Sequence, residues 1–205
     1  YVPLFFVLEG LSKKRSAFIY SFFVFVLWNI FTTYWIYNAS LFGAVAAVLV
    51  NSFLMASVIS IFFWLKSKFN DRRAWWALLS FWLSFEYLHL NWDLSWPWLN
   101  LGNVFAHYPQ SIQWYEYTGT LGGSLWILLA NIILYHSINN KSKYVLPAVV
   151  IVLPILFSFF IKNKNETGKV VEIVVVQPNI DPYLEKFDGL TSIQQLEKFI
   201  DLAES

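Results

Sequence analysis

The sequence predicts an α-helical transmembrane bundle of about five complete helices, followed by the start of an extracytoplasmic α/β domain. Of the 205 residues, 58% are hydrophobic and only 13% are charged, whereas soluble domains carry about 25% charged residues. Residues 16–65 contain no charged side chain. After Lys162 the composition changes to β-branched and then amphipathic segments, which predict the α/β part.

The uncharged stretch must fold back on itself. As one straight helix, residues 16–65 would span roughly 75 Å at ~1.5 Å per residue, and the hydrocarbon core is only ~30 Å thick. The polar break at 38–40 therefore predicts helices at about 16–37 and 41–65. The other apolar segments predict helices at 74–91, 120–138 and 144–161 (the last kinked by Pro147 or Pro154), with 1–11 as the end of an earlier helix.

The basic residues predict the orientation of this bundle. With the helices placed as above, all the Lys and Arg residues that precede position 162 fall in loops on one side. The opposite loops, 38–40 and 92–119, carry none. Cytoplasmic loops are rich in Lys and Arg, so the 92–119 loop and everything after residue 162 are predicted to lie outside. The basic residues are Lys13, Lys14, Arg15, Lys66, Lys68, Arg72, Arg73, Lys141 and Lys143.

The remaining residues suggest a second domain. We expect a bundle at 1–161, a polar linker at 162–168 and a truncated domain at 169–205. The β-branched run at 170–180 predicts a buried strand that Pro178 ends. Thr191 and Gln194 form a capping box that predicts the start of an amphipathic helix. About 40 residues cannot bury a core alone, so we expect the rest of this domain to follow Ser205. Tyr1 lies inside an apolar stretch, so we also expect sequence before it.

Two stretches have a distinctive order of residues. The first is FEYLHLNWDLSWPWLNLGN at 85–103, followed by QWYEYTGTLGGSLWILLAN at 113–131, and the second is VVVQPNIDPYLEKFD at 174–188. Together they resemble bacterial apolipoprotein N-acyltransferases. The family pattern matches at Glu86, at Pro97-Trp98-Leu99, at Gly102, at Glu116 or Gly119, at Val176-Gln177 and at Lys186-Phe187-Asp188. Two positions depart from some members, which carry Arg where this chain has His89 and Trp where it has Phe187.

The resemblance implies a fold and an activity. The outer domain would be the start of a periplasmic nitrilase-like αββα sandwich. The parent enzyme would be a multi-pass, monomeric protein of the bacterial inner membrane that moves an acyl chain from phospholipid to the N-terminal amine of a diacylated apolipoprotein. It would use no cofactor. The net charge of only +1 gives no indication of a nucleic-acid partner. The family's catalytic Glu, Lys and Cys are expected beyond Ser205, so this cysteine-free chain is expected to be inactive alone.

The resemblance also gives candidate lipid-binding residues. Glu86 would order the external loop, and the alternative is that it is solvated or paired at the membrane interface. The loop tryptophans would shape an entrance for acyl chains, or would be interface anchors only. Lys186 and Phe187 would contact lipid at the mouth of the outer site, or lie on an ordinary loop. The candidates are Glu86, Trp92, Trp96, Trp98, Glu116, Lys186 and Phe187.

Further residues bear on alternative functions and on helix packing. A membrane transporter would need ionisable residues or broken helices in mid-membrane, and only Glu86, His89 and Pro154 are candidates. A membrane-anchored carbon–nitrogen hydrolase would use the same outer fold on another substrate. The three histidines are too scattered to predict a metal site. Gly119, Gly122 and Gly123 are expected to let helices approach closely.

Overall fold

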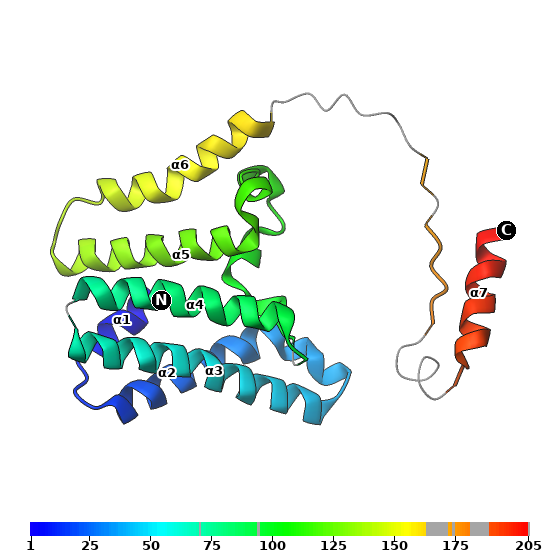
Figure 1. Ribbon diagram of the computed structural model, residues 1–205, viewed down its shortest axis with the longest axis horizontal. Helices are drawn as coiled ribbons and strands as arrows, with labels where there is room; N and C mark the ends of the chain where they lie inside the picture. The colour runs from blue at the N-terminus through cyan, green and yellow to red at the C-terminus, as the bar shows by residue number, and fades with distance from the viewer. Residues whose placement is uncertain (70, 94, 163–171, 174, 181–188, 205) are drawn as a thin grey trace. The chain divides into compact units, whose positions relative to one another are not determined.

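The computed structural model describes residues 1–69, 71–93, 95–162, 172–173, 175–180 and 189–204. The chain divides into two compact units, residues 1–165 and residues 166–205. Figure 1 shows the first unit as a set of helices in which α2, α3, α4 and α5 lie side by side, each antiparallel to the next. The assignment of 162–168 as a linker and of 169–205 as a separate domain stays a prediction.

The first unit contains each helix that hydropathy predicts. The sixth, α6, has Pro154 inside it, and the loop between α4 and α5 is made of short 3-10 turns. In chain order the helices are α1 (Val2–Glu9), α2 (Lys14–Thr33), η1 (Tyr34–Asn38), α3 (Leu41–Lys68), α4 (Asp71–Asn91), η2 (Pro97–Leu99), η3 (Leu101–Phe105), η4 (Pro109–Ser111), α5 (Tyr115–Asn139) and α6 (Val145–Lys162).

Three of the described helical segments are long and apolar enough to cross a membrane. They are Lys14–Asn38, Leu41–Lys68 and Tyr115–Asn139. The apolar part of α6, Val145–Ile161, is shorter. The charged residues Arg72, Arg73 and Glu86 lower the hydropathy of α4. The chain is thus an apolar helical protein with three candidate spans, and the crossing of the membrane by α4 and α6 stays a prediction.

Aromatic rings form the centre of the first unit. Phe5 of α1 lies 5.0 Å from the ring of Trp75 on α4 and 5.7 Å from that of Tyr135 on α5, both in edge-to-face geometry. Phe5 also lies 6.2 Å from the ring of Phe62 on α3, which in turn lies 4.7 Å from that of Trp75. Offset and edge-to-face pairs add to the burial of such rings. The short helix α1 therefore packs against α3, α4 and α5 through the single side chain of Phe5.

A buried polar cluster joins α2 to α3. Asn29 is fully buried; its amide donates to Ser52 Oγ at 3.2 Å, and Asn51 donates to Asn29 Oδ1 at 2.8 Å. Thr33 donates to the Asn29 carbonyl at 2.6 Å. Polar groups in apolar surroundings must be hydrogen-bonded inside the protein. These bonds fix the register of the two helices in the way that interhelical polar contacts do in membrane proteins.

Pro154 interrupts the backbone hydrogen bonds of α6, and a side chain of α5 compensates. A proline has no N–H, so the carbonyl four residues earlier loses its helical donor. That carbonyl belongs to Val150, and the indole N–H of Trp126 donates to it at 2.7 Å. One turn later, Ser158 donates to the carbonyl of Ser111 at 2.8 Å. The proline thus creates an attachment between α6 and α5.

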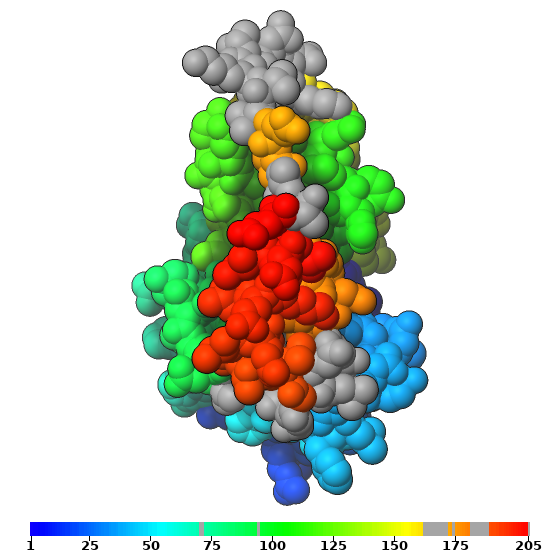
Figure 2. Space-filling model, turned by 90° about the vertical axis from the view of Figure 1, so that its right-hand side faces the viewer, coloured from blue at the N-terminus to red at the C-terminus, as the bar shows by residue number. Residues whose placement is uncertain are grey.

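Apolar side chains also cover the end of the unit where η1 connects α2 to α3. Tyr34 and Trp35 of η1 are exposed, and Phe42 at the start of α3 is 87% exposed. Figure 2 shows this part of the surface in light blue. Amphipathic aromatic rings at the end of a spanning helix suit the membrane–water interface.

The described part of the second unit consists of an extended segment and α7 (Ser192–Glu204). The predicted capping box is confirmed: the Thr191 N–H donates to Gln194 Oε1 at 2.9 Å, and the Gln194 N–H donates to Thr191 Oγ1 at 3.3 Å. These two bonds satisfy backbone donors that the first turn of a helix leaves free.

The buried strand predicted at 170–180 is wrong for the residues that the structure describes there. Residues 172–173 and 175–180 form no strand, and Ile173 and Val175 are exposed. A strand is stable only beside others that share its hydrogen bonds and cover its apolar face. Within the described part of the chain, no second strand lies beside this segment.

Candidate functional site

The carboxyl group of Glu86 is buried and holds a loop. Glu86 lies on α4 and is only 1% exposed. Its Oε1 accepts the backbone N–H of Leu101 at 2.9 Å and the indole N–H of Trp82 at 3.0 Å. The Ser124 hydroxyl lies beside the same carboxyl. Glu86 is therefore not solvated at an interface; it binds the backbone of the loop that follows its helix.

The next residue of the loop is bonded to α5. The Gly102 N–H donates to Ser124 Oγ at 2.8 Å, and the Gly102 carbonyl accepts the Tyr115 hydroxyl at 3.0 Å. Leu101 and Gly102 are both buried. Consecutive residues of η3 are thus held by α4 on one side and by α5 on the other. We call Glu86, Leu101, Gly102, Tyr115 and Ser124 the loop anchor.

Glycines make room for the loop anchor. A Cβ atom on Gly102 would collide with the carbonyl of Thr120, and one on Gly123 would collide with the Tyr115 hydroxyl. Gly119 has a φ of 64°, and its ψ of −172° interrupts α5. Glycine adopts this backbone conformation without strain. Gly122 and Gly123 lie against Thr118 and Tyr115, which precede the kink at Gly119, so these two glycines allow the turn before the kink to approach the helix after it closely.

The predicted tryptophans occupy different environments. The Trp92 indole N–H donates to His89 Nδ1 at 3.2 Å. Trp96 is partly buried, and its indole nitrogen has no hydrogen-bond partner among the described residues. Trp98 is 61% exposed, and its ring meets that of Trp35 edge-on at 6.0 Å. Trp35 was not a candidate, because only the tertiary structure brings η1 to the loop.

The remaining candidates do not join the loop anchor. Glu116 is exposed in the first turn of α5, where a carboxylate is favourable at a helix N-terminus. Lys186 and Phe187 lie outside the described residues. No three His, Cys, Asp or Glu side chains gather as metal ligands within the described ranges. The loop anchor therefore has a structural role: it positions the loop between α4 and α5, on which the Trp98 ring is exposed.

Gly102→Ala is expected to destabilise the first unit by about 1–3 kcal/mol, because the added methyl group collides with backbone rather than with a movable side chain. The measurement is thermal unfolding of the purified protein in detergent. Gly10→Ala is the matched control, since a Cβ there would lie at an ordinary 3.6 Å from the Val7 carbonyl. Equal stability of both variants would show that η3 can move away from α5 without cost.

Comparison with known proteins finds relatives for this chain. Residues 1–133, which include the whole loop anchor, match the family model described as "Apolipoprotein N-acyltransferase N-terminal domain". A curated protein of Chlorobaculum tepidum named apolipoprotein N-acyltransferase is 28% identical over 211 residues. The alignment covers 98% of this chain, which spans 39% of that relative's length. No solved structure matches the chain.

Proposed function

The chain belongs to the apolipoprotein N-acyltransferase family, and from that premise we propose that the complete protein transfers an acyl chain from a phospholipid to the N-terminal amine of a diacylated lipoprotein. The observation that carries this proposal is the family match over residues 1–133. The name of the 28% identical relative agrees with it. The proposed site of action is the bacterial inner membrane, where the apolar helices of the first unit would lie.

The chemistry is assigned to residues outside this chain. In the covalent route that the family resemblance implies, a cysteine thiolate attacks the ester carbonyl of the phospholipid, forming a thioester and releasing a lysophospholipid. The lipoprotein amine then attacks the thioester, which gives an amide and regenerates the thiol. The 205 residues contain no cysteine. A nitrilase-like outer domain, of which residues 169–205 would be the start, is the proposed source of the nucleophile.

The loop anchor is the proposed contribution of this chain. It holds η3 between α4 and α5, while the same loop exposes Trp98 beside Trp35. Such rings bind both acyl chains and the polar interface. We propose that the anchored loop guides phospholipid toward the outer domain. Trp92, Trp96 and Glu116 would border this path, and Lys186 and Phe187 would contact lipid nearer the reaction.

Two of the three features that suggested a transporter, Glu86 and Pro154, have local partners in the fold. Glu86 is occupied by the backbone N–H of Leu101 and the indole of Trp82. The carbonyl freed by Pro154 is satisfied by Trp126. These contacts give both features a role in packing, which does not require a transport site. The carbon–nitrogen hydrolase alternative has no specific support from the bundle, and the family match favours acyl transfer.

The proposed function is tested with the complete protein in phospholipid micelles. A diacylated lipopeptide with a free N-terminal amine is the acceptor, and mass spectrometry detects the added acyl chain. We expect a triacylated product together with an equal amount of lysophospholipid. Release of free fatty acid without acylation of the amine would instead identify a hydrolase. Failure of both reactions, with the protein folded, would overturn the proposal.

The proposed orientation gives a separate prediction. The basic loops should face the cytoplasm, so Ser142→Cys should be protected from an impermeant thiol reagent on intact cells, whereas Ser95→Cys and Asp188→Cys should be labelled. The cysteine-free chain provides the background for these single substitutions. Cell lysis, which should make Ser142→Cys reactive, is the control. Labelling of Ser142→Cys alone in intact cells would reverse the orientation.

A further inference from the structure

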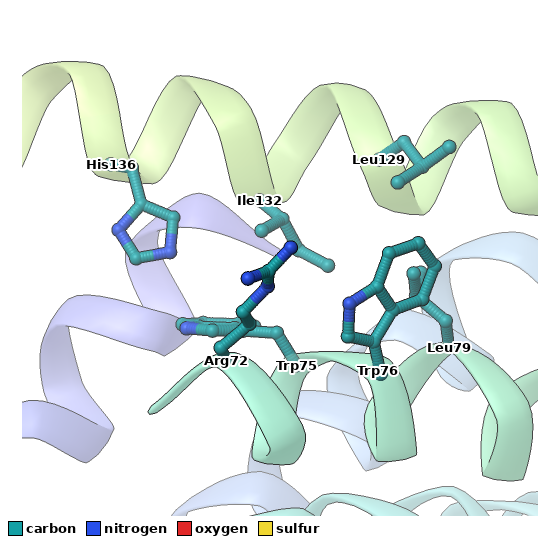
Figure 3. A pocket seen from close by; sticks show the side chains of 7 residues that line it. All are labelled: Arg72, Trp75, Trp76, Leu79, Leu129, Ile132 and His136. Carbon is teal, nitrogen blue, oxygen red and sulfur yellow. The ribbon is translucent and has the colours of Figure 1, made fainter. Parts of the chain in front are cut away.

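A groove of about 370 Å³ is lined by residues of α4 and α5 (Figure 3). It lies toward the end of α4 away from the loop anchor. Arg72 and Glu86 are 14 residues apart on α4, which corresponds to roughly 21 Å along the helix. The basic residues at the groove end are Arg72 and Arg73 in the first turn of α4 and Lys141 and Lys143 in the loop between α5 and α6. The residues that line the groove are Arg72, Trp75, Trp76, Leu79, Leu129, Ile132 and His136.

The lining is polar at one end and apolar at the other. Figure 3 shows the Arg72 side chain rising from α4 toward α5, with the ring of His136 near it. Leu79 and Leu129 face each other farther along the two helices, and the indole of Trp76 stands between these ends. Trp76 is 60% exposed. This order of charge, aromatic ring and aliphatic side chain matches the order of groups in a phospholipid from its phosphate inward.

The charge at the polar end is available to a ligand. No described side chain forms an ion pair with Arg72, and the lining contains no carboxylate. Glu9 lies at the same end of the unit, but its carboxylate accepts the Tyr135 hydroxyl at 2.8 Å and is not part of the groove. A planar guanidinium is well suited to a phosphate because it donates two parallel hydrogen bonds.

We propose that this groove binds one anionic phospholipid from the leaflet on the basic side of the bundle. Its phosphate would contact Arg72 and His136, and one acyl chain would lie along Trp76, Leu79, Leu129 and Ile132. From Arg72 to Leu79 the groove follows seven residues of α4, or about 10 Å, which holds the first part of an acyl chain. A free phosphate ion would leave this apolar part unfilled.

This lipid is distinct from the acyl donor of the proposed reaction. The donor would enter at the loop-anchor end, where Trp98 is exposed, whereas the groove is at the opposite end of α4. A lipid held between α4 and α5 would support their contact without taking part in acyl transfer. The inference therefore stands or falls separately from the proposed activity.

The test is native mass spectrometry of the complete protein, released from micelles that contain equal amounts of dioleoylphosphatidylglycerol and dioleoylphosphatidylcholine. We expect one retained anionic lipid. Arg72→Gln should lower the preference for phosphatidylglycerol by about fivefold, the effect of one basic residue at a lipid surface. Arg72→Lys should restore most of it. Leu129→Trp, which fills the apolar end, should prevent retention of either lipid.

Arg15→Gln is the matched control, because it removes an exposed positive charge from the same basic side but from outside the groove. It should leave the retained lipid unchanged. An equal loss in Arg15→Gln and Arg72→Gln would overturn the proposal in favour of diffuse surface charge. Unchanged lipid retention in Leu129→Trp, measured on protein with normal thermal unfolding, would also overturn it and would fit a groove covered by another segment or a second copy.

Discussion

Glu86→Ala is expected to destabilise the first unit by about 3 kcal/mol and to lower acyl transfer by the complete protein by about tenfold or more. The substitution removes the acceptor of two hydrogen bonds, from the Leu101 N–H at 2.9 Å and the Trp82 indole at 3.0 Å. Both donors would stay buried and unpaired, which costs more than the loss of an exposed bond. Activity should fall because the loop would no longer be held in position.

Three measurements separate these effects. Thermal unfolding reports the stability, limited proteolysis reports the loop between α4 and α5, and lipopeptide acylation reports the activity. Glu86→Gln keeps an oxygen that can accept both bonds and should lie between the wild type and Glu86→Ala. Glu116→Ala removes an exposed carboxylate from the neighbouring helix, so its stability should stay within about 0.5 kcal/mol of the wild type. Full activity and an intact loop in Glu86→Ala would remove Glu86 from the proposed lipid path.

The 205-residue chain expressed alone should show no acyl transfer above the no-enzyme blank. The covalent route requires a thiolate, and the chain has no cysteine to supply one. The assay uses phospholipid micelles and a diacylated lipopeptide, with the complete protein measured beside it. Transfer by the 205-residue chain would refute the assignment of the chemistry to residues outside it.

The sequence predicted the helices well because hydropathy is a local property. The capping box of α7 was also predictable, since its two partners, Thr191 and Gln194, are three residues apart. The strand predicted at 170–180 is absent from the residues described there. A β-branched run gives a segment only a preference for strand, and a stable strand also needs a neighbouring strand from another part of the chain. Predictions that rest on residues close together in the sequence were therefore correct, whereas the prediction that needs a partner far away in the sequence was not.

The candidate site shows the same limit. Glu86 could be identified from the sequence because a carboxyl group in an apolar helix is costly and is usually paired or functional. Its partner Leu101 was not, because an N–H exists at almost every residue and only the folded loop selects one. Trp35 beside Trp98 and Trp126 beside Val150 were missed for the same reason. Their contacts join residues from different helices or loops.

The loop anchor also has a consequence for the order of events during synthesis. Glu86 leaves the ribosome 38 residues before Ser124, an interval of roughly 2–8 s at ~5–20 residues per second. Throughout that interval its carboxyl group lacks the loop and the helix that enclose it in the finished protein. The Trp82 indole of the same helix is then its one partner from this set. Because such an incompletely paired carboxyl is costly inside the bilayer, we expect α4 to wait at the translocon and to enter the membrane together with α5 as a hairpin.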